Sequence, residues 1–413
     1  REIDLAHSDR SKTPIEPLLT DQWFVRMERL AEMAIDAVTS GRVKIVPQRY
    51  SKGYIDWLSE KRDWPISRQL WWGHQIPIWY CKTASESELR RAFAGRNDVV
   101  WQPDEQYNQW LICALEEDLP EDALPGHKLV REQDVLDTWF SSALWPHSTL
   151  GWPEDTPELR YYYPTSVLVT SRDIITLWVA RMVLTGLYNV GEVPFREVYI
   201  HPKILDAYGE GMSKSKGNGV DPVDVMEKFG ADALRFGLAY LTTETQDIRM
   251  SVDFECPHCG KLIEQTKDNR VRPRITCPAC GKDFATQWAS KPEDKALPPG
   301  PVVSERFELA LNFCNKLWNA SRFVLMNLDG YTPERVKEAD LLLEDRWVLS
   351  RLATVSSAVT NALADYRFAD AARTLYDFAW DEFCSFYVEM LKGRLQDAQA
   401  RGMAQRLLAH TLD

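Results

Sequence analysis

Ser166-Val-Leu-Val-Thr170 and Phe195-Arg-Glu-Val-Tyr-Ile200 are two short segments rich in β-branched and aromatic residues. The stretch between them, Ile174 to Leu187, places apolar residues at helical spacing. Strand, helix and strand in this order favour two parallel strands joined by a right-handed crossover, and such sheets bind ligands beyond the carboxyl ends of their strands. The sequence therefore predicts an α/β domain with a parallel sheet at its centre.

Polar residues follow the end of each predicted strand. Asp173 lies three residues after the first strand, and His201 directly follows the second. We expect both side chains at the ligand-binding edge of the sheet, although Asp173 is also suited to cap the following helix. A further helix is predicted from Asp221 to Tyr240, with Asp221-Pro222 as its cap and first turn.

Gly209-Glu-Gly-Met-Ser-Lys-Ser-Lys-Gly-Asn218 occupies the loop between the second strand and that further helix. Its glycines allow the loop to close, and its lysines and serines are suited to neutralise and hydrogen-bond a polyphosphate. A solvent-exposed basic loop would have the same composition, so composition alone leaves both interpretations open. The spacing is not that of a Walker loop.

Two Cys-x-x-Cys-Gly pairs, Cys256 with Cys259 and Cys277 with Cys280, are separated by seventeen residues. This is the spacing of a tetrathiolate zinc site, in which each pair presents two sulfurs to one tetrahedral ion. Two disulfides are the alternative, and they are rare in a reducing compartment. Because four cysteines close the coordination shell, the Zn²⁺ is predicted to be structural, and His258 is expected to face solvent.

Charge is unevenly distributed along the 413 residues. In total, 49 basic and 61 acidic residues give a net charge of −12, which predicts no general attraction to nucleic acid. The segment that carries the paired cysteines is nevertheless locally basic. Its six basic residues from Pro257 to Lys282 are Lys261, Lys267, Arg270, Arg272, Arg274 and Lys282.

Three long amphipathic helices are predicted beyond the Pro-rich linker at Pro298 to Pro301. Their apolar residues recur at three-and-four spacing, which is typical of a helical bundle and far less often of a cofactor-binding box. The three patterns run from Phe307 to Leu328, from Val348 to Tyr366 and from Ala372 to Met390, and a fourth helix begins near Met403.

The remaining segments carry fewer signals. Gln22 to Ser40 has a helical pattern that ends at Gly41, and residues 82–130 are acidic and interrupted by prolines, which indicates a surface insertion with little chemistry. The most apolar stretch, Val167 to Val190, contains three charges, so we expect no membrane span. The first residue is Arg1, and we therefore expect a piece of a longer protein. The two cysteine pairs and four scattered cysteines suit a reducing compartment, so we expect the cytoplasm.

Gly211-Met-Ser-Lys-Ser215, followed by Lys-Gly-Asn, resembles the lysine-methionine-serine-lysine-serine signature of the class I aminoacyl-tRNA synthetases. Further motifs are similar, in the same order, to those of the valyl-tRNA synthetases, and together they cover nearly the whole chain except the cysteine segment. The double tryptophan before Gly73 favours the valyl enzymes over their isoleucyl and leucyl relatives. The motifs are Asp63-Trp-Pro-Ile-Ser-Arg-Gln-Leu-Trp-Trp-Gly-His74, Asp134-Val-Leu-Asp-Thr-Trp-Phe-Ser-Ser142, Leu168-Val-Thr-Ser-Arg-Asp-Ile-Ile175, Trp178-Val-Ala-Arg-Met182 and Asn312-Phe-Cys-Asn-Lys-Leu-Trp-Asn-Ala320.

The resemblance implies a ligase that uses ATP, with Mg²⁺, to convert valine to valyl-adenylate and pyrophosphate, and then transfers valine to the 3′ end of tRNA(Val). It implies that Lys214 is the catalytic residue that stabilises the leaving pyrophosphate. Met212, Ser213 and Ser215 would shape the ATP-binding loop around it.

The same resemblance implies roles for residues elsewhere. Asp173 would lie near the ATP ribose, and His201 would bind ATP just before the loop. Trp72 would wall the pocket for the valine side chain, with Ser67 and Gln69 also at the substrate; an ordinary core position is the alternative for Trp72. An apolar wall cannot strongly reject isosteric threonine, which explains why the family edits its products.

The chain also departs from the family pattern. Gly211 replaces the first lysine of the signature, and Ser171 and Pro202 stand where glycine is usual. Lys216 and Lys203 are the lysines that could replace the missing charge. The His-x-Gly-His motif, the editing domain and the C-terminal coiled coil are absent from the sequence.

We therefore expect a fragment with three parts. Residues 1–253 would be the second half of a class I Rossmann-type catalytic domain with the return from the editing insertion, 254–300 an inserted four-cysteine zinc ribbon, and 301–413 a truncated helical anticodon-binding domain. The ribbon would either contact tRNA or brace the junction between the other two parts. Such a fragment is expected to be inactive alone. A non-catalytic paralogue that binds tRNA or a protein partner is the alternative, because Gly211 removes a signature lysine.

Overall fold

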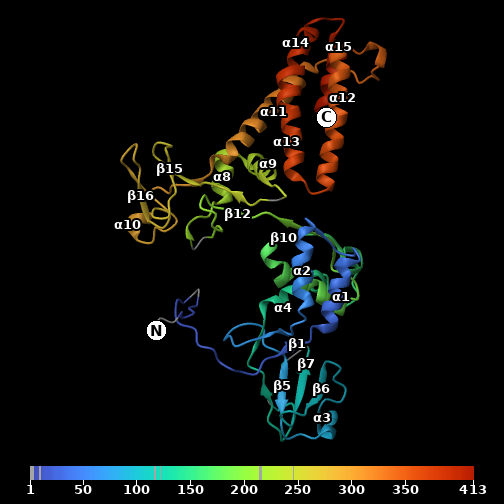
Figure 1. Ribbon diagram of the computed structural model, residues 1–413, viewed down its shortest axis with the longest axis vertical. Helices are drawn as coiled ribbons and strands as arrows, with labels where there is room; N and C mark the ends of the chain where they lie inside the picture. Colours follow the sequence, from blue (N-terminus) through green and yellow to red (C-terminus); the bar gives the residue numbers. More distant parts are fainter. Residues whose placement is uncertain (1–3, 9–10, 116–117, 121, 214–215, 245) are drawn as a thin grey trace. The chain divides into compact units, whose positions relative to one another are not determined.

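The computed structural model describes residues 4–8, 11–115, 118–120, 122–213, 216–244 and 246–413. The chain divides into two compact units, Arg1–Val198 and Tyr199–Asp413, and each is described by itself (Figure 1). Within the described ranges, none of the helices combines the length and the apolar character that crossing a membrane requires.

A three-stranded sheet forms the centre of the first unit. Its strand order is β10, β11, β2, so the two strands predicted from the sequence are neighbours, and the connection between them is helical. The predicted strand–helix–strand unit is therefore confirmed, although its helix begins with a 3-10 turn and a π-helical turn. The elements are β2 (Lys44–Val46), β10 (Thr165–Ser171), the 3-10 helix Arg172–Ile174, the π-helix Ile175–Val179, α7 (Ala180–Asn189) and β11 (Phe195–His201), which continues into the second unit.

Helix α1 (Glu28–Thr39) begins six residues later than the predicted start at Gln22. The reason is that Phe24–Val25 forms strand β1, which pairs with β3 (Trp64–Pro65). A stripe of small buried residues, Ala31, Ala34 and Ala37, allows α1 to pack closely against α7. The other elements are α2 (Arg49–Ser59), β4 (Ser67–Arg68), β9 (Val135–Leu136), α4 (Thr138–Ala143), α5 (Trp145–Ser148) and α6 (Pro157–Tyr162).

The predicted surface insertion is a folded subdomain of the first unit. Its four-stranded antiparallel sheet has the order β6, β7, β5, β8 and encloses a core that includes Trp79, Leu89 and Ile112. Pro120 and Pro125, which suggested an irregular segment, lie between β7 and β8. The elements are β5 (Ile78–Cys81), α3 (Glu86–Ala92), β6 (Val99–Asp104), β7 (Gln109–Ala114) and β8 (Val130–Arg131).

The second unit begins with a short parallel pair, β12 (Ile204–Leu205) and β13 (Ile248–Arg249). Between them the prediction of one helix is wrong, because α8 (Pro222–Phe229) and α9 (Ala231–Leu241) are separate. Gly230, at φ +88°, breaks the helix in a conformation that side-chain-bearing residues avoid. The predicted cap is confirmed, since the Asp221 carboxylate accepts a hydrogen bond from the Val223 N–H at 2.9 Å.

Residues 253–303, here called the cysteine module, contain two separate small sheets. Strand β14 pairs with β15 and β18, and β16 pairs with β17. A small apolar cluster around Phe254, Ile275 and Phe284 lies between the two sheets. The elements are β14 (Asp253–Glu255), β15 (Leu262–Glu264), β16 (Arg274–Thr276), β17 (Asp283–Ala285), α10 (Pro292–Lys295) and β18 (Val302–Val303).

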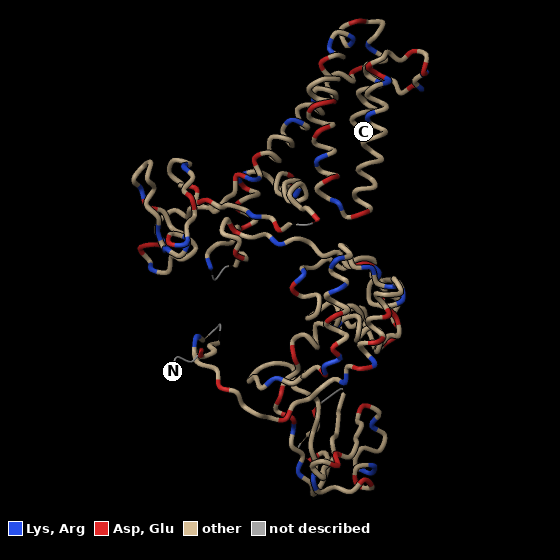
Figure 2. Tube along the Cα trace, in the orientation of Figure 1, with Lys and Arg blue, Asp and Glu red and all other residues tan. Residues whose placement is uncertain are grey.

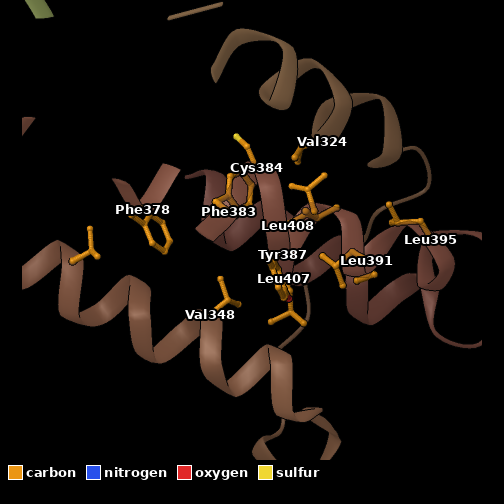
Figure 3. Packing of buried hydrophobic residues seen from close by; sticks show 13 residues of the cluster. Val324, Val348, Phe378, Phe383, Cys384, Tyr387, Leu391, Leu395, Leu407 and Leu408 are labelled. Carbon is orange, nitrogen blue, oxygen red and sulfur yellow. The ribbon is translucent and has the colours of Figure 1, made fainter. Parts of the chain in front are cut away.

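The predicted helices form a bundle at the C-terminal end (Figure 3). Buried side chains from each helix meet in one cluster that includes Val324, Val348, Tyr387 and Leu408. The third predicted helix contains a π-helical segment in its middle, and the fourth begins at Arg401. The elements are the 3-10 helix Glu305–Phe307, α11 (Glu308–Asn327), the 3-10 helix Glu338–Asp340, α12 (Leu343–Ala364), α13 (Phe368–Asp377), the π-helix Phe378–Tyr387, α14 (Val388–Gln396) and α15 (Arg401–Leu412).

Candidate functional site

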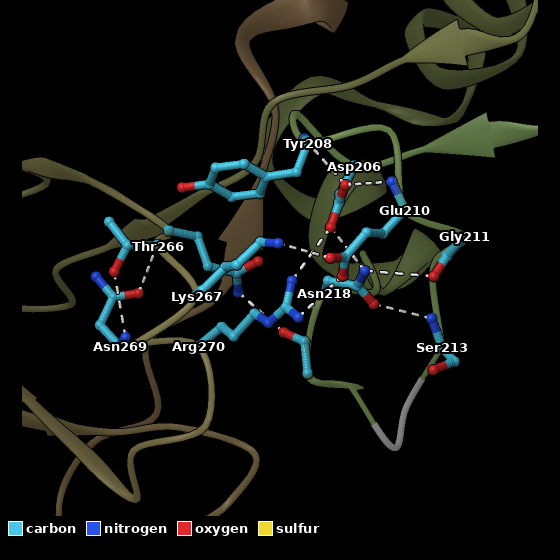
Figure 4. Close-up of polar contacts among 12 residues, drawn as sticks. Asp206, Tyr208, Glu210, Gly211, Ser213, Asn218, Thr266, Lys267, Asn269 and Arg270 are labelled. Carbon is cyan, nitrogen blue, oxygen red and sulfur yellow. Dashed lines mark hydrogen bonds and ion pairs between the residues drawn. The ribbon is translucent and has the colours of Figure 1, made fainter. Parts of the chain in front are cut away.

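A buried carboxylate organises the loop that carries the signature (Figure 4). Asp206 is 3% exposed and accepts hydrogen bonds from the backbone N–H groups of Tyr208 at 3.0 Å and Glu210 at 2.8 Å. Burial by itself raises the pKa of a carboxyl group, but hydrogen bonds from Asn218 and these two N–H groups hold the pKa of Asp206 below its ordinary value. The carboxylate is therefore charged at neutral pH.

Asn218 joins the two ends of the loop. Its fully buried side chain donates from Nδ2 to Asp206 Oδ2 at 2.8 Å and accepts from the Ser213 N–H at 3.0 Å. The loop from Asp206 to Asn218 is therefore closed at its base by side chains. Lys214 and Ser215, the predicted catalytic residue and its neighbour, lie outside the described residues.

A cavity of about 520 Å³ lies beside this loop. It combines apolar walls with the ring of His201, and His201 Nδ1 lies 2.9 Å from the Pro202 carbonyl oxygen. Because a carbonyl oxygen only accepts, Nδ1 carries the proton of this hydrogen bond. The structure thus brings His201 and Met212, both predicted to bind ATP, to one cavity. Its lining residues are His201, Pro202, Lys203, Ile204, Gly211, Met212, Leu238, Thr242 and Ile248.

The predicted valine-binding residues belong to the first unit. Trp72 is 89% exposed, so the alternative that it is an ordinary core residue is wrong. Gln69 Nε2 donates to Asp134 Oδ2 at 2.7 Å. Ser67 is buried, and its hydroxyl donates to Gln22 and accepts the Trp23 N–H, both at 2.9 Å. Ser67 is therefore engaged in holding the N-terminal segment.

Asp173 is also in the first unit, just after β10. It lies inside the 3-10 helix Arg172–Ile174, and the residue at the N-cap of this helix is Ser171. Asp173 already makes an interaction within the protein. The position follows the carboxyl end of the strand, as predicted, and it is not the capping position.

The four paired cysteines form a compact group in the cysteine module. Their sulfur atoms all lie within 4.8 Å of one another, with Cys256 3.7 Å from Cys280 and Cys259 3.6 Å from Cys277. These distances exclude S–S bonds of about 2.05 Å. They match the separation of about 3.8 Å between sulfurs that Zn–S bonds of about 2.3 Å give in a tetrahedron.

Each knuckle is shaped to present its sulfurs. Gly260 and Gly281 adopt positive φ angles of +71° and +70°, and each N–H turns back to the carbonyl of the first cysteine of its pair at 2.9 Å. The backbone N–H groups of Cys280 and Ala279 lower the pKa of the Cys277 thiol to about 6. His258 is exposed and hydrogen-bonds the Asp283 carbonyl, which agrees with its predicted position outside the ligand set.

Basic and acidic residues are interspersed along the cysteine module (Figure 2), and three of its six predicted cations are paired with carboxylates. Lys267 and Arg270 pair with carboxylates of the signature loop, and Arg274 pairs with the buried Asp294 at 2.8 Å. Lys261, Arg272 and Lys282 are exposed and make no ion pair among the described residues. The cationic surface left for another molecule is therefore smaller than the sequence suggested.

Sequence reasoning missed three residues that shape this site. Asp206, Gln265 and Arg270 converge on the base of the loop from positions that are far apart in the chain. The one usable signal was the Asp206-x-x-Gly209 spacing, which is typical of a turn before the loop. Nothing in the spacing of Gln265 and Arg270 pointed to the loop.

Comparison with known proteins identifies the class. A family model described as tRNA synthetases class I (I, L, M and V) matches residues 3–251, and one described as the anticodon-binding domain of tRNA ligase matches residues 345–413. The chain belongs to the class I tRNA synthetase family. Neither model covers residues 252–344, which contain the cysteine module.

Relatives identify the member of the class. The chain is 61% identical to a valine–tRNA ligase of Rhodopirellula baltica, over 100% of this chain and 42% of that protein. It is 46% identical to a valine–tRNA ligase of Carboxydothermus hydrogenoformans, over 97% of this chain and 37% of that protein. The chain is therefore a homologue of valine–tRNA ligase that spans about two fifths of the length of these curated relatives.

A solved structure supports the fold. Mycobacterium tuberculosis methionyl-tRNA synthetase, in complex with methionyl-adenylate, matches with a TM-score of 0.59 and 17% identity over 98% of this chain and 61% of that one. At this identity the likeness shows the fold alone. It confirms a class I synthetase catalytic fold followed by a helical C-terminal region.

Proposed function

We propose that this chain is part of an enzyme that activates valine with ATP and transfers it to tRNA(Val). The observation that carries the proposal is the 61% identity to a valine–tRNA ligase along the whole chain, which includes the closed signature loop. The cavity beside that loop supports it, since about 520 Å³ is within the range of small-molecule sites. Translation enzymes of this kind work in the cytoplasm, where free thiols persist.

In the first half-reaction, the carboxylate of valine attacks the α-phosphorus of ATP, the bond to the bridging oxygen breaks, and pyrophosphate leaves with Mg²⁺. Negative charge grows on the leaving group, so a cation placed there stabilises the transition state more than the ground state. Lys214 has this role in our proposal. Met212, Ser213 and Ser215 shape the loop, while Asp173 and His201 bind the nucleotide.

Recognition of valine falls to the first unit in this proposal. Trp72, whose indole is exposed on the loop after β4, supplies an apolar wall for the valine side chain. Gln69 is held by Asp134 and orients the same loop, and Ser67 anchors the strand from which the loop starts. Replacing Trp72 with alanine should raise the KM for valine and leave the KM for ATP unchanged.

We further propose that the four cysteines hold one structural Zn²⁺. The ion completes a tetrathiolate shell with no open position, so it supplies folding energy and no step of the reaction. The proposed division of the chain is a catalytic half at 1–253, the zinc ribbon at 254–300 and an anticodon-binding domain at 301–413. Alone, the 413-residue chain should not catalyse valine-dependent pyrophosphate exchange.

The signature lysine gives the sharpest test in the full-length enzyme. Lys214→Ala should slow adenylate formation by about 100-fold or more, while the affinity for valine changes little. Lys282→Ala is the control, because Lys282 is an exposed lysine of the cysteine module that makes no ion pair among the described residues. Equal losses in both variants, or a parallel loss of valine affinity, would contradict the role of Lys214.

The missing first lysine supports the second candidate, a non-catalytic paralogue. Gly211 is exposed, and a Cβ built there meets no heavy atom within 4 Å, so Gly211→Lys fits sterically. If the enzyme is catalytic, this variant should retain or increase its rate of pyrophosphate exchange. If neither the parental enzyme nor Gly211→Lys turns over while tRNA binding persists, the paralogue interpretation is correct.

A further inference from the structure

The segment between the two cysteine pairs touches the base of the signature loop (Figure 4). Gln265, which is buried, donates from Nε2 to the Gly217 carbonyl oxygen at 3.0 Å. The guanidinium of Arg270 donates to Asp206 Oδ2 at 3.2 Å and to Glu210 Oε2 at 3.1 Å, and its side chain is 13% exposed. The contact therefore reaches the same carboxylate that organises the loop.

The backbones of the two segments also pack directly. Gly217 has a φ of +69°, and a Cβ built on it would lie 2.6 Å from the Arg270 carbonyl oxygen and 2.7 Å from Trp288 Nε1. Such distances leave no room for a side chain. Glycine at position 217 thus allows the loop to lie against the cysteine module without a gap.

The charges at this contact balance. Lys267 Nζ lies 2.8 Å from Glu210 Oε1 and 5.2 Å from the centre of the Tyr208 ring, so Glu210 receives both Lys267 and Arg270. Two cations meet the two carboxylates of Asp206 and Glu210. Because they are neutralised in place, these cations hold the loop and do not replace the signature lysine at a phosphate.

Arg270 is itself held by a hydrogen-bonded turn. The Thr266 N–H donates to Asn269 Oδ1 at 2.7 Å, the Asn269 N–H donates to Thr266 Oγ1 at 3.2 Å, and the Arg270 N–H donates to the Thr266 carbonyl at 3.0 Å. This turn lies between the knuckle that ends at Gly260 and the knuckle that begins at Cys277. Both ends of the segment are therefore attached to the thiolate cluster.

A metal ion would join the two halves of the module. Strands β15 and β16 flank the turn but belong to different sheets, with no pairing between them among the described strands. The two sheets are connected by the small apolar cluster, by backbone hydrogen bonds between Ala285 and residues 298–300, and by the hydrogen bond between His258 and the Asp283 carbonyl. The group of four sulfurs also spans both halves. A bound ion therefore restrains the ends of the segment that carries Gln265 and Arg270.

We propose that the cysteine module positions the signature loop, with Gln265 and Arg270 as positioning residues and metal binding to the four cysteines as the restraint that holds them in place. This inference rests on the proposed function insofar as the loop is assigned to ATP. It adds a role that differs from both earlier interpretations of the module, as a tRNA contact or as a brace between domains.

The test measures amide hydrogen exchange by mass spectrometry in the 413-residue chain, over peptides spanning 206–213. Arg270→Met removes two charge-assisted hydrogen bonds from the loop, so exchange there should become at least about tenfold faster. Arg272→Met is the matched control, because Arg272 is exposed and makes no ion pair among the described residues. Arg270→Lys should restore part of the protection.

A second pair of variants changes residues outside the module. Gly217→Ala should separate the loop from the module and accelerate exchange over 206–213, whereas Gly219→Ala should not, since a Cβ at Gly219 comes no closer than 4.0 Å to other atoms. Removing the metal from the parental chain with a chelator should have the same effect as Arg270→Met. The proposal would be overturned if amide exchange over 206–213 stayed unchanged both after metal removal and in Gly217→Ala.

Activity of the full-length enzyme separates this proposal from the proposed function. Arg270→Met should lower kcat for pyrophosphate exchange by about tenfold or more and leave the KM for valine unchanged. If the parental enzyme shows no exchange of pyrophosphate, the proposed function fails while the amide-exchange result still decides the positioning role. If Arg270→Met lowers kcat no more than Arg272→Met does, the positioning role is wrong.

Discussion

Asp345 carries a fully buried charge at the start of helix α12, and its removal should strongly destabilise the bundle. Its carboxylate accepts hydrogen bonds from Arg394 Nη1 at 2.6 Å and Nη2 at 3.0 Å, from Tyr387 Oη at 3.0 Å and from the Leu342 N–H at 3.1 Å. Arg394 is 14% exposed, so water cannot replace this partner. The change Asp345→Asn keeps the shape of the side chain and removes its charge.

The expected loss in the free energy of unfolding follows from the Arg394 guanidinium, which Asp345→Asn leaves without its charged partner. Breaking a buried ion pair by neutralising one partner costs about 3–5 kcal/mol, because the other charge stays desolvated. Glu344, whose carboxylate lies 3.8 Å from Arg394, offsets a part of this cost. For a unit of this size, 1 kcal/mol corresponds to roughly 2–4 °C, so Tm of the second unit should fall by roughly 6–20 °C.

A half-exposed ion pair of the same bundle is the control. Glu382 binds Arg351 through two hydrogen bonds of 2.7 and 2.8 Å, but the Arg351 side chain is 40% exposed. Glu382→Gln should therefore cost about 1 kcal/mol or less. Scanning calorimetry gives Tm, and loss of helical circular dichroism assigns the transition to the bundle. Equal shifts in the two variants would refute the argument from burial.

Three further outcomes are expected. Chelation of the metal should expose the four module thiols to a thiol reagent, while the helical circular dichroism of the bundle stays unchanged. A loss of helix would contradict the separation between the apolar cluster of the cysteine module and that of the bundle. The pKa of Asp206 is depressed in the folded chain, so its contribution to stability is present above the unfolded value of about 3.9 and is lost as the pH falls through the folded value. Urea titrations between pH 3 and 7 should accordingly show a smaller loss of stability at acid pH in Asp206→Asn than in the parental chain. Gly237→Ala should lower the free energy of unfolding by about 1–3 kcal/mol in thermal melts, because its Cβ would lie 2.8 Å from the buried Phe307 ring. Gly53→Ala, in open space within α2, should raise the free energy of unfolding by about 0.5–1 kcal/mol.

Local patterns were sufficient for much of the architecture. The strand–helix–strand unit from Thr165 to His201, the four cysteines and the long helices are each encoded by neighbouring residues, because periodicity and ligand spacing act within one segment. The sequence motifs also led to the correct family. Local reasoning failed where backbone geometry overrode periodicity, as at Gly230, where an uninterrupted apolar pattern contains a residue at φ +88° that ends the helix.

The small sheet of residues 78–131 shows a second kind of failure. Its strands are paired in the order β6, β7, β5, β8. Strands β5 and β7 are therefore neighbours in the sheet, although helix α3 and strand β6 lie between them in the sequence. Strands β5 and β7 are mostly apolar, but the acidic residues and the prolines of the segment favoured a loop. Its stability comes from pairing and from the shared core around Ile112, which exist once the chain has folded.

The sequence by itself determined the class of protein, the group of four cysteines and the signature loop, because each is encoded by residue types at fixed short spacing. The tertiary structure decided what holds that loop. Asp206, Asn218, Gln265 and Arg270 come together across gaps of 12 to 64 residues. Hydrogen bonds and ion pairs of this kind depend on distances in space, so they cannot be predicted from periodicity along the sequence.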